Sequence, residues 1–132
     1  MKKIEHIGIA VKNLSEANAL YSKLLGTEPY KEEAVESEGV ITSFFKIGET
    51  KIELLAATSE ESTISKYIEK RGEGIHHIAF YVDDIESEVT RLQAEGFKIL
   101  NTTPKKGADQ KKVVFLHPKS TTGVLIELCE NL

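Results

Sequence analysis

The sequence lacks most features that mark secreted and membrane-bound proteins. Its 132 residues include a single cysteine, Cys129, so no disulfide can form within the chain, and this predicts a reducing compartment. No apolar stretch approaches the length that crosses a membrane, and the start of the chain lacks the apolar core of a signal peptide. We therefore expect a cytoplasmic protein with no membrane partner.

The sequence also lacks the long runs of lysine and arginine typical of nucleic-acid-binding proteins. It has 17 basic and 21 acidic residues and a net charge of −4, so we expect no nucleic-acid partner. One short basic cluster is present, formed by Lys105, Lys106, Lys111 and Lys112. Because charged side chains mostly stay in solvent, a solvated surface is the simpler interpretation, and attraction of an anionic substrate is the alternative.

What the chain does contain is an internal repeat. Residues 4–11, IEHIGIAV, recur as residues 75–82, IHHIAFYV, so that His6 and His77 occupy the same place 71 residues apart. Each half then ends in an apolar run that carries one carboxylate, Glu53 in the first and Glu127 in the second. Each half therefore supplies one histidine near its start and one glutamate near its end.

The apolar pattern predicts the same order of elements in both halves. In the first half we expect a strand over 3–11, a helix from an Asn13 cap to Gly26 with an apolar stripe, and strands at about 28–36, 39–47 and 50–57. In the second half we expect a strand over 75–82, a helix capped by Asp83 or Asp84, and strands at about 97–102, 111–117 and 123–129. The helical stripe of the first half comprises Ala17, Leu20, Tyr21, Leu24 and Leu25.

Each half thus has the order β-α-β-β-β, which predicts an α+β fold. One helix cannot cover both faces of a four-stranded sheet, so we expect the two halves to form one curved eight-stranded cup with helices outside. The chain is long enough for one domain. We expect a single domain over 1–132, with module one at about 1–57, a connecting helix at about 58–74, and module two at about 75–132.

The two repeated histidines are candidate ligands. Side chains alternate along a strand, so His6 shares a face with Gly8, and His77 shares one with Ala79. These small neighbours leave room for a bound group. His76 is adjacent to His77 and faces away, so we expect a structural role for it. A lone histidine at the start of a strand is usually structural, but two at matching places favour a site.

The two glutamates complete the pattern. Glu53 and Glu127 each interrupt a strongly apolar strand, and a buried carboxylate without a partner costs several kcal/mol. A divalent metal ion would satisfy both glutamates and both histidines. Two imidazoles and two carboxylates suit Zn, Co, Ni or Mn, with positions left open for water or substrate.

With these residues in place, the chain resembles the vicinal oxygen chelate superfamily, whose members are built from paired βαβββ modules with a metal at the centre. The resemblance covers essentially all 132 residues. Within the superfamily it is similar to the methylmalonyl-CoA epimerases, through Glu61-Ser62-Thr63, Gly74-Ile75-His76-His77, His117-Pro118-Lys119-Ser120 and Gly123 to Leu128. The resemblance implies four metal ligands, which are His6, Glu53, His77 and Glu127.

The resemblance also implies an isomerase that acts on an acyl-CoA substrate. The 2R and 2S epimers would interconvert as a proton leaves one face of a carbon and returns to the other, through a metal-stabilised enediolate. Glu127 is the expected base, and Glu53 or a bound water is the expected second one. Some epimerases carry a glutamate at the position of Thr42, which cannot serve as a carboxylate base. Thr42 and Lys119 are predicted substrate contacts, and a homodimer is expected.

The main alternative is glyoxalase I, or lactoylglutathione lyase, which acts on the methylglyoxal–glutathione hemithioacetal with the same ligand scheme. The two carboxylates of glutathione are commonly held by arginine, and this chain has only Arg71 and Arg91, both toward predicted helix ends. Metal-free binding modules of this fold should lack the four ligands. Extradiol-type dioxygenases would not need Glu53 as a ligand.

Overall fold

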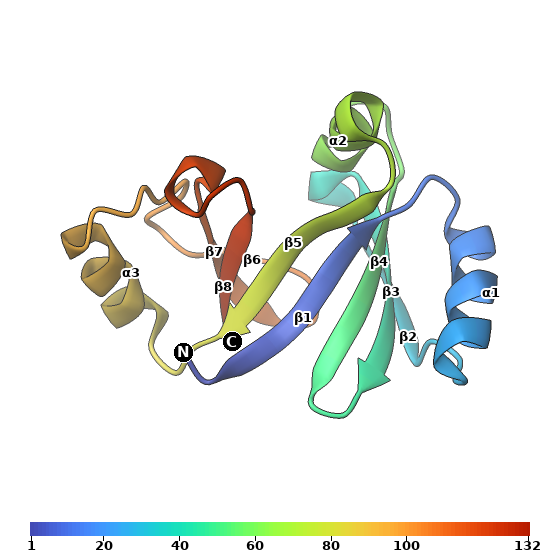
Figure 1. The fold of residues 1–132 in the computed structure, drawn as a ribbon, viewed down its shortest axis with the longest axis horizontal. Coiled ribbons are helices and arrows are strands. Elements are labelled where there is room, and N and C mark those ends of the chain that lie inside the picture. Colours follow the sequence, from blue (N-terminus) through green and yellow to red (C-terminus); the bar gives the residue numbers. More distant parts are fainter. The chain divides into compact units, whose positions relative to one another are not determined.

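The computed structural model describes all 132 residues (Figure 1). The chain divides into two compact units. One comprises Ile7–His76, and we call it the α1 unit after its first helix. The other comprises Met1–His6 together with His77–Leu132, and we call it the α3 unit. Two strands pass from one unit into the other, β1 (Lys3–Ala10) and β5 (Gly74–Tyr81).

The α1 unit contains four strands in the hydrogen-bonded order β2-β3-β4-β1, with β2, β3 and β4 antiparallel (Figure 1). At its end of β1, the Val11 N–H donates to the Leu55 carbonyl. Its other elements, in chain order, are α1 (Leu14–Leu25), β2 (Lys31–Val35), the 3-10 turn η1 (Glu36–Glu38), β3 (Val40–Ile47), β4 (Thr50–Ala57) and α2 (Thr63–Arg71).

The ends of the first two helices follow from local side chains. The Asn13 side chain accepts a hydrogen bond of 2.9 Å from the Glu16 N–H, as the sequence predicts, and Gly26 ends α1 in the left-handed conformation that glycine favours. The connecting helix, predicted at about 58–74, begins later: Ser62 caps α2, and its side chain accepts from the Ser65 N–H. The predicted stripe of α1 is too wide, because Leu20 and Leu24 are exposed and the helix packs through Ala17, Leu14, Tyr21 and Leu25.

The sheet of the α1 unit has two different faces. Phe45, Leu54 and Ala56 pack against α1, whereas Leu55 packs with Ala10 and with Ile64 of α2. Successive residues of a strand point to opposite faces, so the face that carries Leu55 also carries Glu53. The register places Thr42 opposite Leu55 and Phe44 opposite Glu53, which puts Thr42 on that same face.

The α3 unit contains the start of β1 and the order β1-β5-β8-β7-β6. Its Lys2 N–H donates to the Tyr81 carbonyl, β8 runs parallel to β5, and β7 runs antiparallel to β8 and β6. Its remaining elements are α3 (Ile85–Ala94), β6 (Lys105–Lys106), β7 (Lys111–Leu116), the 3-10 turn η2 (Pro118–Ser120) and β8 (Ile126–Asn131). Asp84 is the α3 cap and accepts from the Ser87 N–H.

The sheet of the α3 unit is also two-sided. One face packs against α3 through an apolar cluster of Val82, Ile85, Val89, Leu92, Val114, Leu116 and Leu128. The other face carries Ala79, Val113 and Cys129, with Tyr81 and Phe115 beside them. One face of each sheet thus packs against α1 or α3, and the other face of each carries a smaller apolar cluster.

The predicted strand at 97–102 is wrong, and the side chain of Asn101 gives the reason. Ile99 makes one isolated bridge with Leu116, and the regular strand is the two-residue β6 further on. The Asn101 side chain takes the place of the backbone beside β7: its Oδ1 accepts from the Phe115 N–H at 2.9 Å, and its Nδ2 donates to the Val113 carbonyl at 3.2 Å. A side chain thus interrupts the ladder.

The eight strands and three helices confirm the predicted α+β class with two βαβββ modules. The first module is β1-α1-β2-β3-β4 and the second is β5-α3-β6-β7-β8, with α2 between them. None of the helices has both the length and the apolar character needed to span a membrane.

We predict that Asn101→Ala lowers the free energy of unfolding by about 1–3 kcal/mol, because it leaves an N–H and a carbonyl of β7 without their partner. Urea denaturation followed by circular dichroism measures the change. The control is Thr102→Ala, the exposed neighbour, which should lie within about 0.5 kcal/mol of the unchanged protein. Equal stability of the two variants would remove Asn101 as the support of β7.

Candidate functional site

Three of the predicted ligands lie together within the α3 unit. His6 comes from β1, His77 from β5 and Glu127 from β8, which are three consecutive strands. The register places Ala79 and Phe115 on either side of Glu127, and His77 shares the face of Ala79 by alternation. The fold therefore converts three positions far apart in sequence into one group on one face of a sheet.

The ligand atoms of these residues converge. The Nε2 atoms of His6 and His77 lie 2.9 Å apart, with the two ring planes at 88°. Glu127 reaches both rings, with Oε1 3.4 Å from His77 Nε2 and Oε2 3.7 Å from His6 Nε2. All three side chains are buried, with exposed fractions of 5, 5 and 6 %. Such a group of histidine and carboxylate atoms could hold a metal ion.

The donor set and its spacing fit a divalent metal ion. Two ring nitrogens facing each other at 2.9 Å repel through their lone pairs unless a proton or a cation lies between them. Ligands at about 2.1 Å from a shared ion lie roughly 3 to 3.4 Å from one another, close to the distances found here. Two imidazoles and a carboxylate are ligands that first-row transition metals and zinc accept.

The electrostatics of Glu127 favour a positive partner. Burial raises the pKa of its carboxyl above the ordinary value, because removal from water penalises the charged form. His6 acts in the opposite direction, Glu5 raises the pKa further, and Lys105 and Lys111 lower it. Because burial is the largest of these influences, the ionised carboxylate gains most from a cation placed directly against it.

Sequence reasoning missed one buried residue of this group. Glu5 is 3 % exposed, and its Oε1 lies 3.0 Å from His6 Nδ1. Adjacent residues of a strand point to opposite faces, so the sequence did not predict a role for Glu5 beside His6. The available signal was the acidic residue directly before a candidate ligand, because ligating histidines commonly use their second nitrogen to contact a carboxylate.

The equivalent position in the second half of the repeat is His76, in the α1 unit. Its ring packs edge-on against Tyr67, with centroids 4.8 Å apart. Burial lowers the pKa of His76 to about 4, so its imidazole is neutral at physiological pH. A neutral, packed ring fits the structural role expected for it.

Glu53 and Thr42 lie in the α1 unit, where they share one face of the β3–β4 pair. Both are buried. The pairing of β3 with β4 sets their positions: Glu53 lies opposite Phe44, and Thr42 lies opposite Leu55. The roles expected for them, as metal ligand, second base and substrate contact, stay predictions.

The lysines have unequal environments. Lys119 is exposed in the turn η2, where its N–H donates to His117 Nδ1, so its role in substrate binding stays a prediction. Lys112 pairs with Glu130 at 3.1 Å. The interpretation of the basic cluster as solvated surface is wrong for Lys111, which is buried with its Nζ 3.3 Å from the Asp109 carbonyl. Lys105 extends over the Phe115 ring, at 5.7 Å from its centroid.

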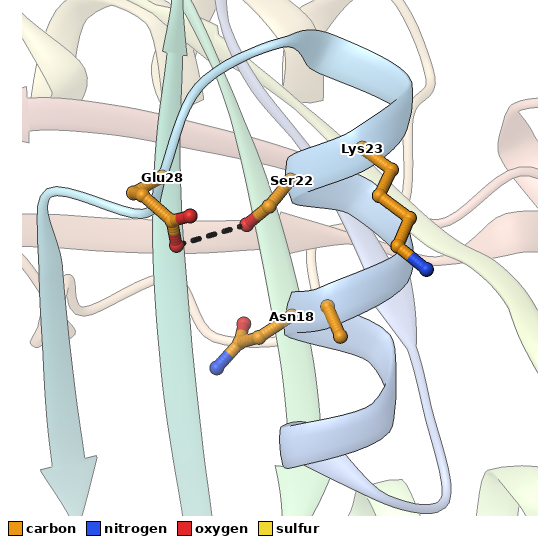
Figure 2. A pocket seen from close by; sticks show the side chains of 5 residues that line it. Asn18, Ser22, Lys23 and Glu28 are labelled. Carbon is orange, nitrogen blue, oxygen red and sulfur yellow. Dashed lines mark hydrogen bonds between the residues drawn. The ribbon is translucent and has the colours of Figure 1, made fainter.

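A hollow of about 470 Å³ lies elsewhere, beside α1 (Figure 2). It is lined by Asn18, Ala19, Ser22, Lys23 and Glu28. The Ser22 hydroxyl donates to a Glu28 carboxylate oxygen at 3.3 Å, as the dashed line in Figure 2 marks. The hollow contains one carboxylate and no histidine, so it offers no set of ligands comparable to the group around His6.

Comparison with known proteins identifies the relatives of this chain. The model of the glyoxalase/bleomycin resistance protein/dioxygenase superfamily matches residues 5–115. The mitochondrial methylmalonyl-CoA epimerase of Dictyostelium discoideum is 44 % identical and is matched over 98 % of this chain and 78 % of its own. The ethylmalonyl-CoA/methylmalonyl-CoA epimerase of Cereibacter sphaeroides is 41 % identical over 96 % of each chain.

Solved structures show the same relationship. A hypothetical protein of Bacillus halodurans superimposes with a TM-score of 0.96 at 45 % identity, covering 98 % of this chain and 94 % of the other. The Streptomyces coelicolor methylmalonyl-CoA epimerase in complex with 2-nitronate-propionyl-CoA superimposes with a TM-score of 0.94 at 34 % identity, covering 99 and 95 %. The chain therefore belongs to the glyoxalase/bleomycin resistance/dioxygenase superfamily, whose members are also called vicinal oxygen chelate proteins.

Proposed function

We propose that this protein is a metal-dependent methylmalonyl-CoA epimerase, an isomerase that interconverts the 2R and 2S epimers of its substrate. The observation that carries the proposal is the convergence of His6 Nε2, His77 Nε2 and the Glu127 carboxylate on three neighbouring strands. The epimerases that match nearly the whole of this chain support the choice of reaction and of an acyl-CoA substrate.

His6, His77 and Glu127 would hold the metal ion, with Glu53 as the fourth ligand. Glu53 shares a face of β4 with Leu55, which packs against Ala10 of the neighbouring strand β1. Alternation along β1 continues from Ala10 to His6, so both residues belong to the same face of that strand. Glu53 is buried within an apolar strand, where a carboxylate gains from a cation.

The bound metal ion would supply a Lewis acid that stabilises negative charge developing on the substrate oxygens. The chain's own residues would move the proton. Burial raises the pKa of the Glu127 carboxyl, and a carboxylate with a raised pKa is a stronger base. Glu53 would be the second base, which returns the proton to the other face of the carbon.

The remaining roles follow from the same proposal. The Thr42 hydroxyl, which cannot act as a carboxylate base, would contact the substrate by a hydrogen bond. Lys119 is exposed and could meet a coenzyme A phosphate as a point charge. A single domain over 1–132, a homodimer and a cytoplasmic location belong to the proposal as well. Sedimentation velocity would test the homodimer.

We predict that the protein loaded with Co²⁺ or Zn²⁺ exchanges the C2 proton of methylmalonyl-CoA in deuterated water and racemises it. Mass spectrometry measures deuterium at C2, and metal analysis should give one ion per chain. A chelator should abolish the exchange, and added metal should restore it. Turnover of the methylglyoxal–glutathione adduct without exchange of the CoA thioester would instead identify glyoxalase I.

We predict that Glu127→Gln slows C2 exchange by roughly 10²- to 10⁴-fold, because an amide cannot accept the proton. The fold should survive, since glutamine keeps the shape of the side chain. The control is Glu95→Gln at the exposed end of α3, which should leave the exchange rate unchanged. A near-normal rate in the Glu127 variant would take this residue out of the proton transfer.

A further inference from the structure

The contact between Glu5 and His6 has no role in the reaction as proposed above. Both side chains are buried, and Glu5 Oε1 lies 3.0 Å from His6 Nδ1, within ordinary hydrogen-bond distance. A carboxylate with 3 % exposure costs free energy unless it is hydrogen-bonded or paired. The chain nevertheless places one directly behind a candidate ligand, on the side of the ring away from His77.

The chemistry of imidazole links the two nitrogens of His6. A neutral ring carries one N–H, so a proton on Nδ1 leaves a lone pair on Nε2. A carboxylate beside Nδ1 favours the N–H there, because an ionised carboxylate only accepts hydrogen bonds. The lone pair then points toward His77 Nε2 and Glu127, where the metal ion would bind.

The geometry of the two rings makes orientation important. The planes of His6 and His77 are at 88°, so a lone pair of each ring reaches the common point only in a particular rotation about the side-chain bonds. The hydrogen bond to Glu5 fixes that rotation for His6. The repeat is asymmetric here, since the residue before His77 is the neutral His76, which packs on Tyr67.

We propose that Glu5 is a positioning residue: it holds His6 in the tautomer with the proton on Nδ1 and fixes the ring so that the Nε2 lone pair binds the metal ion. The negative charge of Glu5 also makes Nε2 a better electron-pair donor to the metal ion. This inference rests on the metal site of the proposed function, but it concerns metal affinity and the state of His6, and it can be tested without a substrate.

The first test is a titration of the metal-free protein with Co²⁺, followed by visible absorption and calorimetry. Glu5→Gln should weaken the affinity by roughly 10- to 100-fold, the range for loss of such a partner. Glu5→Asp, which keeps the charge, should recover part of that affinity. Affinity in Glu5→Gln equal to that of the unchanged protein would overturn the proposal.

A matched control separates positioning from general stability. Glu130 is also a largely buried carboxylate, which accepts from the Ile85 N–H at 2.7 Å and pairs with Lys112. Glu130→Gln should lower the melting temperature and leave the Co²⁺ affinity unchanged. If Glu5→Gln loses no more affinity than Glu130→Gln, the role of Glu5 is structural and the inference is wrong.

The second test reads the tautomer directly in the unchanged protein. Long-range ¹H–¹⁵N spectra of the zinc-loaded form should show a protonated Nδ1 and a metal-bound Nε2 for His6. The metal-free Glu5→Gln variant should show a mixture of tautomers where the unchanged protein shows one. A metal-bound Nδ1, or the same single tautomer in both proteins, would overturn the proposal. Tight Co²⁺ binding without C2 exchange would contradict the epimerase function alone.

Discussion

The rest of the site depends on one close contact between two imidazole nitrogens, His6 Nε2 and His77 Nε2. At 2.9 Å their lone pairs repel unless a proton or a cation lies between them. Glu127 adds a buried carboxyl group, whose oxygens lie 3.4 Å from His77 Nε2 and 3.7 Å from His6 Nε2. A bound cation would relieve both the repulsion of the nitrogens and the cost of burying the carboxylate.

The duplication explains how such a group arises, and also where symmetry stops. Each copy delivers a histidine at the start of its first strand and a glutamate in its last, and parallel pairing of β5 with β8 sets Glu127 beside the strand of His77. The residue before each histidine differs, however. Glu5 contacts His6, whereas His76 is a neutral ring packed on Tyr67. Equal positions in the repeat thus have different contacts.

Much of the fold and of the residue group could be predicted from the sequence, because the second copy of the repeat provides a check on the first. The histidines, Glu127 and the βαβββ order were recoverable, since chance does not place the same residues twice at matching points. Three features were not. Because adjacent residues of a strand are expected on opposite faces, the contact of Glu5 with His6 could not be predicted. The ladder beside β7 is interrupted by one asparagine side chain. Helical spacing alone does not separate Tyr21, which packs against the core, from exposed Leu20. Each depends on where a single side chain ends, which periodicity does not encode.

The α3 unit has two buried carboxyl groups, Glu5 and Glu127, and their neighbouring groups differ. Glu5 is committed to His6 Nδ1, and its charge raises the pKa of Glu127. Burial is the largest cause of the raised pKa, and His6, Lys105 and Lys111 oppose it. Where two carboxylates share a site, the one with fixed hydrogen bonds orients and the one with the raised pKa exchanges protons. In the proposed reaction, the residue that would orient His6 would thus also help to raise the pKa of Glu127, the proposed base.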